Sequence, residues 1–174
     1  MSAPRTTRAR RSKVAPFEID MAVEGGAWDD PGALEALARR AFAAAFSVAS
    51  DRPRGEVEIG LLFTDDDGIR ALNRDWRDKD KPTNVLSFPA PAQQGAPGPR
   101  PLGDIAVAFE TVAREAEEEG KLFDDHLSHL LVHGLLHLLG YDHALEAEAE
   151  IMEGLEVRAL ATLGIADPYR DMAA

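Results

Sequence analysis

The sequence predicts an α+β fold, a single domain in which a small four-stranded mixed sheet is packed with about five helices. The chain has 174 residues, of which 45% are hydrophobic, so it can form one globular domain with its own core. All segments with the pattern of strands lie before residue 110, and three consecutive helical segments follow them. The predicted order, β-α-β-α-β-β-α-α-α, is typical of helices that cover a sheet.

The first half of the chain is expected to contain two strands, each followed by a helix. Alternating apolar residues over 17–23 predict the first strand, and the segment EVEIGLLF over 56–63 predicts the second. Asp30 is placed to cap the first helix, whose apolar residues recur at helical spacing. Thr64 or Asp65 is placed to cap the second helix.

The second half is expected to complete the sheet and then continue as helices. A short strand over 85–88 and a strand over 104–109 flank residues 93–103, which are rich in Gly and Pro and predict an exposed loop. Gly120 and Gly140 are placed to end the first two helices that follow. The three helices are expected over 110–120, about 124–139 and 144–164.

The charge distribution predicts an acidic domain behind a basic N-terminus. Residues 1–15 hold five Lys or Arg and no acid, and are expected to form a flexible tail before a single domain over 16–170. The remainder has 14 basic and 31 acidic residues, a formal charge of −17, against −12 for the whole chain. Such a surface repels nucleic acid, so RNA binding needs a local basic patch.

Other features of the composition predict a cytoplasmic protein that does not associate with membranes. The N-terminus lacks the apolar segment of a signal peptide, and no apolar run is long enough to span a bilayer. The absence of cysteine excludes disulfides, thiol ligands and a cysteine nucleophile.

The stretch HGLLHLLGYDH, residues 133–143, has the spacing of a metal site. His133 and His137 are four residues apart on the predicted long apolar helix, so they project from one face. Gly140 permits a sharp turn, after which His143 can return toward them at the C-terminal end of that helix. Three neutral imidazoles suit one Zn²⁺ ion and leave a coordination position open, as in catalytic sites, although Ni²⁺, Cu²⁺ or Fe²⁺ would also fit.

Three nearby residues have roles that the sequence leaves open. His129 lies one turn before His133 and is a fourth ligand, a partner of a ligand or a core residue, and the last two are preferred. His126 is expected to be solvated near the start of the helix. Asp142 either orients an imidazole or lies in the turn and faces solvent.

The histidine spacing is that of a metzincin protease, but the residue after the first histidine differs. In those peptidases it is a Glu that activates the metal-bound water, whereas here it is Gly134. A metallopeptidase therefore loses its general base. Phosphodiester cleavage tolerates this loss better, with water at the metal or the 2′-hydroxyl of RNA as nucleophile and an arginine to stabilise charge.

A local cluster of cations provides a candidate site for an anionic substrate. Five basic residues lie within twelve positions, namely Arg70, Arg74, Arg77, Lys79 and Lys81. The three arginines have the spacing of one helix face, and Trp76 can stack on a base. The alternative is a solvated helix face on which neighbouring acids neutralise these cations, namely Asp75, Asp78 and Asp80.

Three stretches together resemble the YbeY endoribonuclease family. They are LNRDWRDKDKPTNVLSFP, LGDIAVAF and HLLVHGLLHLLGYDH, and the similarity covers about residues 56–160. The resemblance implies a zinc-dependent, single-strand-specific endoribonuclease in ribosomal RNA processing. It also implies action at the 3′ end of the small-subunit RNA and in ribosome quality control, with the small ribosomal subunit and its assembly factors as partners.

The resemblance also implies roles for individual residues. His133, His137 and His143 would hold the metal, and Arg77 matches a functionally important arginine that binds phosphate or stabilises transition-state charge. The other four cations are then candidates for substrate binding, namely Arg70, Arg74, Lys79 and Lys81. Further motif positions are expected to hold the loops around the cleft, namely Thr83, Asn84, Ser87 and Asp104.

Two other functions compete with an RNA hydrolase. One is a non-catalytic ribosome-assembly factor in which the histidine site is structural. The other is a metallopeptidase or a related metal hydrolase, against which Gly134 counts.

Overall fold

The computed structural model describes residues 16–50, 52–91 and 97–170, so the predicted tail over 1–15 lies outside the described residues. The order of elements within this part is the predicted one. The four strands are β1 (Phe17–Glu24), β2 (Val57–Thr64), β3 (Val85–Pro89) and β4 (Arg100–Ala108). The five helices are α1 (Pro31–Val48), α2 (Asp66–Arg77), α3 (Phe109–Glu118), α4 (Phe123–Leu138) and α5 (Glu146–Thr162).

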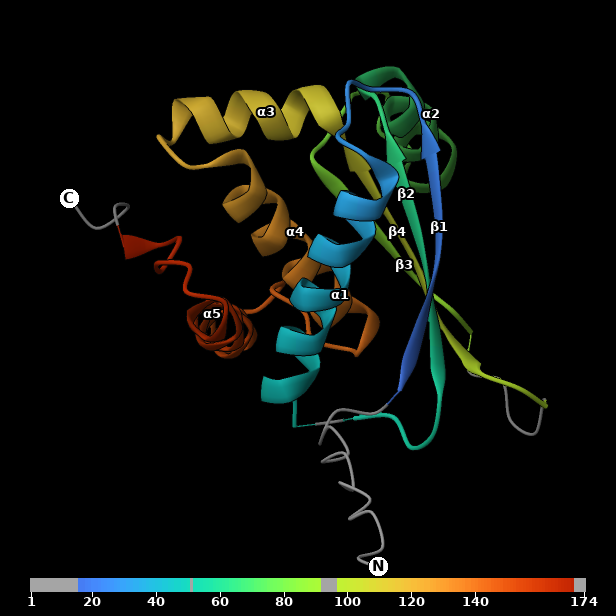
Figure 1. The fold of residues 1–174 in the computed structure, drawn as a ribbon, viewed down its shortest axis with the longest axis vertical. Coiled ribbons are helices and arrows are strands. Elements are labelled where there is room, and N and C mark those ends of the chain that lie inside the picture. Colours follow the sequence, from blue (N-terminus) through green and yellow to red (C-terminus); the bar gives the residue numbers. More distant parts are fainter. Residues whose placement is uncertain (1–15, 51, 92–96, 171–174) are drawn as a thin grey trace, which may run out of the picture.

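The strands form one mixed sheet in the order β1-β2-β4-β3, which confirms the predicted α+β class. β1 and β4 both run parallel to β2, while β3 runs antiparallel to β4 at the edge. α1, α4 and α5 lie on one side of the sheet and α2 lies on the other (Figure 1).

The prediction that residues 93–103 form a loop is wrong at its C-terminal end, because β4 begins at Arg100. Arg100 and Pro101 pair with the first residues of β2, and the register then shifts so that Leu102 is an extra residue. A bulge of this kind tolerates Pro and Gly within a strand. The Leu102 side chain is buried, which explains why the chain stays on the sheet.

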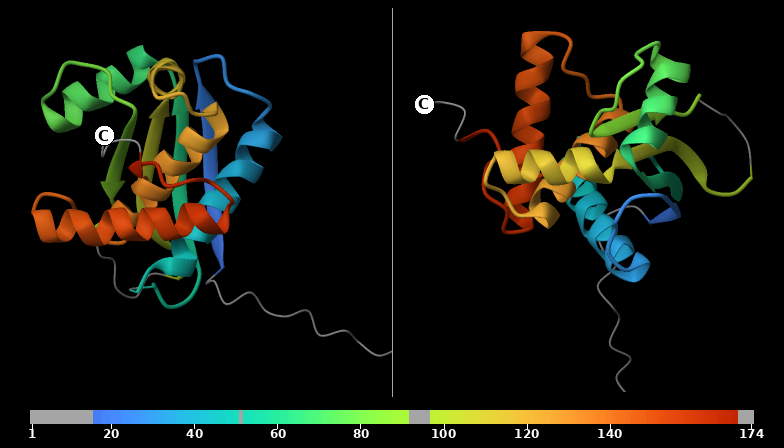
Figure 2. Two further views of the ribbon diagram at one scale, coloured as in Figure 1. Left: turned by 90° about the vertical axis from the view of Figure 1, so that its left-hand side faces the viewer. Right: turned by 90° about the horizontal axis from the view of Figure 1, so that it is seen from above.

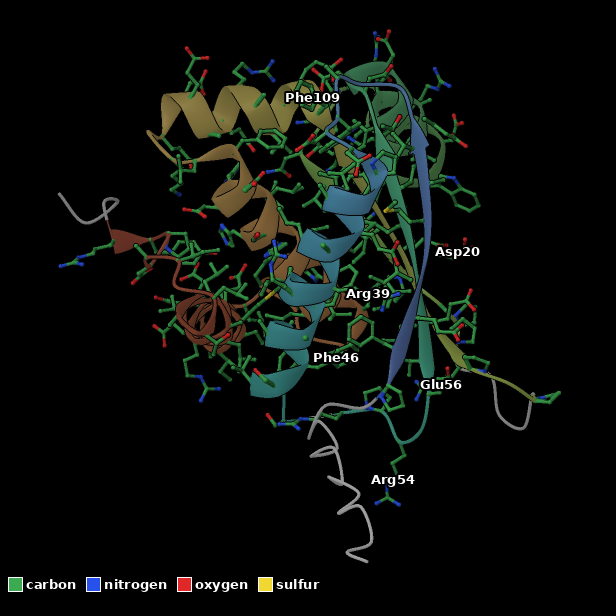
Figure 3. The ribbon with its side chains drawn as sticks, viewed as in Figure 1. Asp20, Arg39, Phe46, Arg54, Glu56 and Phe109 are labelled. Carbon is green, nitrogen blue, oxygen red and sulfur yellow. The ribbon has the colours of Figure 1, made fainter. Side chains whose placement is uncertain are left out.

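The main core lies between the sheet and the helices α1, α4 and α5. Phe46 on α1 is fully buried, and its ring centroid lies 5.4 Å from that of Phe17 on β1. Asp20, on the alternate face of β1, projects away from these helices (Figure 3). α4 contacts β3, β4 and each of α1, α3 and α5, so it is the central helix of the layer.

The helices α1 and α2 begin at the capping residues that the sequence predicts. The Asp30 carboxylate accepts a hydrogen bond from the Ala33 amide at 3.2 Å at the start of α1. At α2 the cap is Asp65, which accepts from the Gly68 amide at 2.8 Å, while the Thr64 hydroxyl donates to the Glu24 carbonyl. In the described part of the chain, no helix has both the length and the apolar character needed to cross a bilayer.

Candidate metal centre and its cleft

Three histidines meet at the C-terminal end of α4. His133 and His137 come from the helix, and His143 comes from the segment between α4 and α5. One ligand nitrogen from each lies within 4.8 Å of the other two. The ring centroids are 4.7, 5.0 and 5.5 Å apart, so the cluster is compact enough for the three imidazoles to hold one metal ion.

The turn after α4 brings His143 back to the helix. The Gly140 amide donates to the His137 carbonyl and the Tyr141 amide to the Leu136 carbonyl, the paired bonds of a Schellman motif. Gly140 has φ +100°, a conformation that favours glycine. Asp142 lies in the turn, exposed, and accepts from the His143 amide at 2.7 Å, which is the second of its two expected roles.

The surroundings of His137 favour the neutral, metal-binding form of its imidazole. Partial burial lowers the pKa of His137, and the positive charges that His133 and His143 would carry lower it further. Neutral imidazole is the form that ligates zinc. The donor set therefore fits a zinc ion chemically as well as geometrically.

A buried carboxylate supports two histidines of α4 from behind. Glu156 on α5 lies 2.7 Å from His133 Nδ1 and 3.1 Å from His129 Nε2. His129 is outside the three-histidine cluster, in agreement with its preferred role as a partner or core residue. Figure 2 shows α5 crossing the helix layer, with α4 between it and the sheet.

The ionised state of Glu156 is strongly favoured. Burial alone would raise the pKa of its carboxyl group, but hydrogen bonds and charge from His129 and His133 outweigh this effect and lower the pKa to about 2. The Tyr169 hydroxyl donates to the second carboxylate oxygen at 2.8 Å. Burial and the neighbouring charge raise the pKa of Tyr169 well above its usual range, so it remains a donor.

A cleft of about 600 Å³ opens at the histidine cluster, and Arg77 lies in its wall. The Arg77 guanidinium donates from Nη2 to the Ser87 carbonyl at 2.6 Å and lies 5.4 Å from the centre of the Phe88 ring. One nitrogen is therefore anchored to β3, while the other N–H groups of the guanidinium provide further donors at the cleft. Asn84 also lines this cleft.

The structure separates Arg77 from the other predicted cations. Arg70 pairs with Asp80 at 2.8 Å and Arg74 pairs with Asp75 at 3.0 Å, both in exposed positions. The two lysines, Lys79 and Lys81, are exposed, and neither they nor the other two arginines line the cleft. The alternative of a solvated face therefore describes Arg70 and Arg74 better than a single basic surface does.

Comparisons with known proteins give the family. The model of the family described as "Endoribonuclease YbeY" matches residues 29–164. The chain belongs to the endoribonuclease YbeY family. Endoribonuclease YbeY of Rhodopseudomonas palustris is 54% identical and covers 94% of this chain and 90% of its own. The proteins of that name from Rhizobium etli and Agrobacterium fabrum are each 53% identical, cover 90% of this chain, and match over 95% and 96% of their own lengths.

A solution structure of a Thermotoga maritima protein has the same fold. It aligns with a TM-score of 0.50 at 24% identity, over 83% of this chain and 91% of the other. At this identity the likeness concerns the fold alone.

Gly134, the glycine within the histidine motif, faces the sheet. A Cβ built on it would lie 3.2 Å from Ile105 side-chain carbons and 3.2 Å from Ser87 Oγ. The Ser87 hydroxyl donates to the Gly134 carbonyl at 3.3 Å, so α4 packs closely on β3 and β4. A side chain added at this position would therefore start in close contact with Ile105 on β4 and Ser87 on β3.

Gly134→Glu is expected to lower the stability of the fold by about 3 kcal/mol or more, because it inserts a charged side chain into a packed interface. For a chain of this size, that corresponds to a fall in melting temperature of about 6–12 °C. The matched control is Gly154→Glu on α5, where nothing lies within 4 Å of the added Cβ. Equal melting temperatures for the two variants would contradict the close packing at Gly134.

The expectation that His126 is solvated is wrong. Its side chain is 5% exposed, and Nε2 lies 3.0 Å from Glu115 Oε1 on α3. The Asn84 amide donates to the same carboxylate at 3.0 Å, so this network ties the loop before β3 to α3 and α4. His126 lies in the first turn of α4, but α3 covers this turn, which local sequence does not reveal.

Two further motif residues take different places. Ser87 lies at the cleft. Asp104 is the strand partner of Phe88, and its side chain lies on the other face of the sheet, so it does not hold a loop around the cleft. Glu156 is a site residue that was not predicted from the sequence, although the sequence holds a signal for it. Glu156 falls on the buried stripe of α5, which otherwise consists of Met152, Leu155, Ala159 and Leu160.

Proposed function

We propose that the chain is a zinc-dependent endoribonuclease that cleaves single-stranded RNA. The main support is that a three-imidazole cluster and the Arg77 guanidinium line one cleft. Membership of the endoribonuclease YbeY family supports RNA as the substrate. We further propose that the protein works in the cytoplasm on small-subunit ribosomal RNA, at its 3′ end and in ribosome quality control, with ribosomal subunits and assembly factors as partners.

Each cleft residue has a distinct role in this proposal. His133, His137 and His143 would hold the ion, and a bound zinc ion supplies Lewis-acid chemistry to the cleft. Arg77 would donate hydrogen bonds to the phosphate oxygens, where negative charge grows in the transition state. The anchor to Ser87 fixes the guanidinium before substrate arrives, which reduces the ordering cost of the reaction.

The exposed cations outside the cleft would bind the RNA backbone, namely Arg70, Arg74, Lys79 and Lys81. We expect the double variant Lys79→Ala and Lys81→Ala to weaken RNA binding several-fold at low salt and to leave the cleavage rate at saturating RNA unchanged. Two phosphate contacts fewer should reduce the slope of log affinity against log salt by about 1.4 for single strands. An unchanged salt slope, measured by fluorescence anisotropy, would remove these lysines from the binding surface.

A second candidate function is a non-catalytic ribosome-assembly factor. The observation that favours it is the formal charge of −17 on residues 16–174, which suits a basic protein partner better than free RNA. Cleavage by the pure, zinc-loaded chain separates the two functions, because an assembly factor would bind its partner and cut nothing.

Substrate class is tested by offering one RNA sequence as a single strand and as a duplex. We expect zinc-loaded protein to cut the single strand at least ten-fold faster, and to leave a peptide library intact. Preferential cleavage of the duplex would contradict the single-strand specificity. Cleavage of peptides would favour the metallopeptidase.

A further inference from the structure

Glu156 joins three parts of the fold at one buried point. Its side chain is 1% exposed on α5, and its two oxygens meet donors from α4 and from the C-terminal segment. Oε1 is shared by His133 Nδ1 and His129 Nε2, at 2.7 and 3.1 Å. Oε2 accepts from the Tyr169 hydroxyl at 2.8 Å.

This geometry determines which ring nitrogen of His133 carries the proton. An ionised carboxylate has no hydrogen to give, so every partner within hydrogen-bond distance of it must donate. In its neutral form, His133 is then protonated on Nδ1, and its lone pair lies on Nε2. The same reasoning places a proton on Nε2 of His129 and leaves the Nδ1 lone pair without a hydrogen-bond partner, as observed.

We propose that Glu156 is a positioning residue that holds His133 in the Nδ1–H tautomer and in its ring orientation, so that Nε2 is presented to the metal. The inference rests on the proposed function only in that a metal ion binds the three histidines. A carboxylate behind a ligating imidazole orients the ring and raises its basicity, and its loss typically lowers metal affinity 10–100-fold.

The position of Glu156 argues against a purely structural carboxylate. A buried carboxylate that only joined α4 to α5 would be satisfied by His129 and Tyr169, which already supply one donor to each oxygen. The third contact is the shortest of the three, and it goes to a histidine of the cluster at the cleft. The shortest hydrogen bond of the network is therefore the one that orients His133, a candidate metal ligand.

The test combines two measurements on the full chain. In the metal-free protein near pH 8, long-range ¹H–¹⁵N spectra of the histidine rings report the tautomer of His133. Zinc affinity is measured by competition with a chromophoric chelator for wild type, Glu156→Gln and the control Glu153→Gln. The control makes the same chemical change one turn earlier on α5, at an exposed position.

We expect the Nδ1–H tautomer in wild type and a 10–100-fold loss of zinc affinity in folded Glu156→Gln. Glu153→Gln should bind zinc as wild type does. Wild-type affinity in folded Glu156→Gln would overturn the proposal, as would an Nε2–H tautomer in the wild-type protein. If Glu156→Gln does not fold, the wild-type tautomer alone decides.

Failure of the proposed function gives a different result. A wild-type chain that binds no zinc would remove the zinc site, whereas the tautomer in metal-free protein would still show whether Glu156 orients His133.

Discussion

Replacing His137 with alanine is expected to abolish zinc binding and RNA cleavage together while the chain stays folded. The substitution leaves two imidazoles in the cluster. It removes the middle one, since the His137 ring lies closer to each of the other two rings than they lie to one another. Loss of a ligand should cost more than the 10–100-fold that is typical of residues behind the ligands. The side chain is only partly buried, so the core should tolerate its removal.

The measurement is zinc content by mass spectrometry and cleavage of a single-stranded RNA, each for wild type and variant after identical zinc loading. The matched control is Glu150→Ala, which truncates an exposed side chain on α5. Circular dichroism of the metal-free proteins shows whether the fold is retained. A folded His137→Ala protein that holds zinc and cuts at the wild-type rate would remove His137 from the site.

Arg77→Ala is expected to keep zinc and lose cleavage by about 10²–10³-fold, the typical cost of a preorganised donor to developing charge. The Arg77 side chain lines the cleft, where it is bonded to β3. It does not belong to the group of side chains that can hold the ion. Metal content and turnover should therefore separate in this variant. Arg77→Lys should recover only part of the rate, because a lysine keeps the charge without the planar fork of donors.

The control for Arg77→Ala is Arg39→Ala, which removes an exposed arginine of α1 that pairs with Glu35 at 3.0 Å. Single-turnover rates at saturating RNA show whether the loss lies in the chemical step. If Arg77→Ala weakens RNA binding alone and keeps the wild-type rate at saturation, Arg77 binds phosphate in the ground state and does not stabilise the transition state.

Much of the fold is predictable because its signals are local. Capping residues, helical periodicity and the turn at Gly140 each depend on a few neighbouring positions, and α1, α2 and the end of α4 follow them. The histidine cluster is predictable for the same reason, since two members lie on one helix face and a glycine turn returns the third.

The errors arise where distant segments decide the outcome. β4 begins early because β2 pairs with residues that composition alone assigns to a loop. His126 is buried because α3 covers the first turn of α4. The place of Arg77, which is an observation and not an error, also depends on a distant segment, because its guanidinium is bonded to β3. Glu156 lies among the apolar residues of the buried face of α5, but only the packing of α5 on α4 shows that its partner is His133.

The most direct test of a metal-dependent endoribonuclease is removal and return of zinc. A single-stranded RNA that carries the 3′ end of the small-subunit RNA is incubated with zinc-loaded, chelator-stripped and zinc-restored protein, beside His137→Ala purified in the same way. We expect cleavage with the loaded protein, its loss on stripping and its return with one equivalent of zinc. Equal cleavage by stripped and loaded protein, or none by protein shown to hold zinc, would contradict the proposed function.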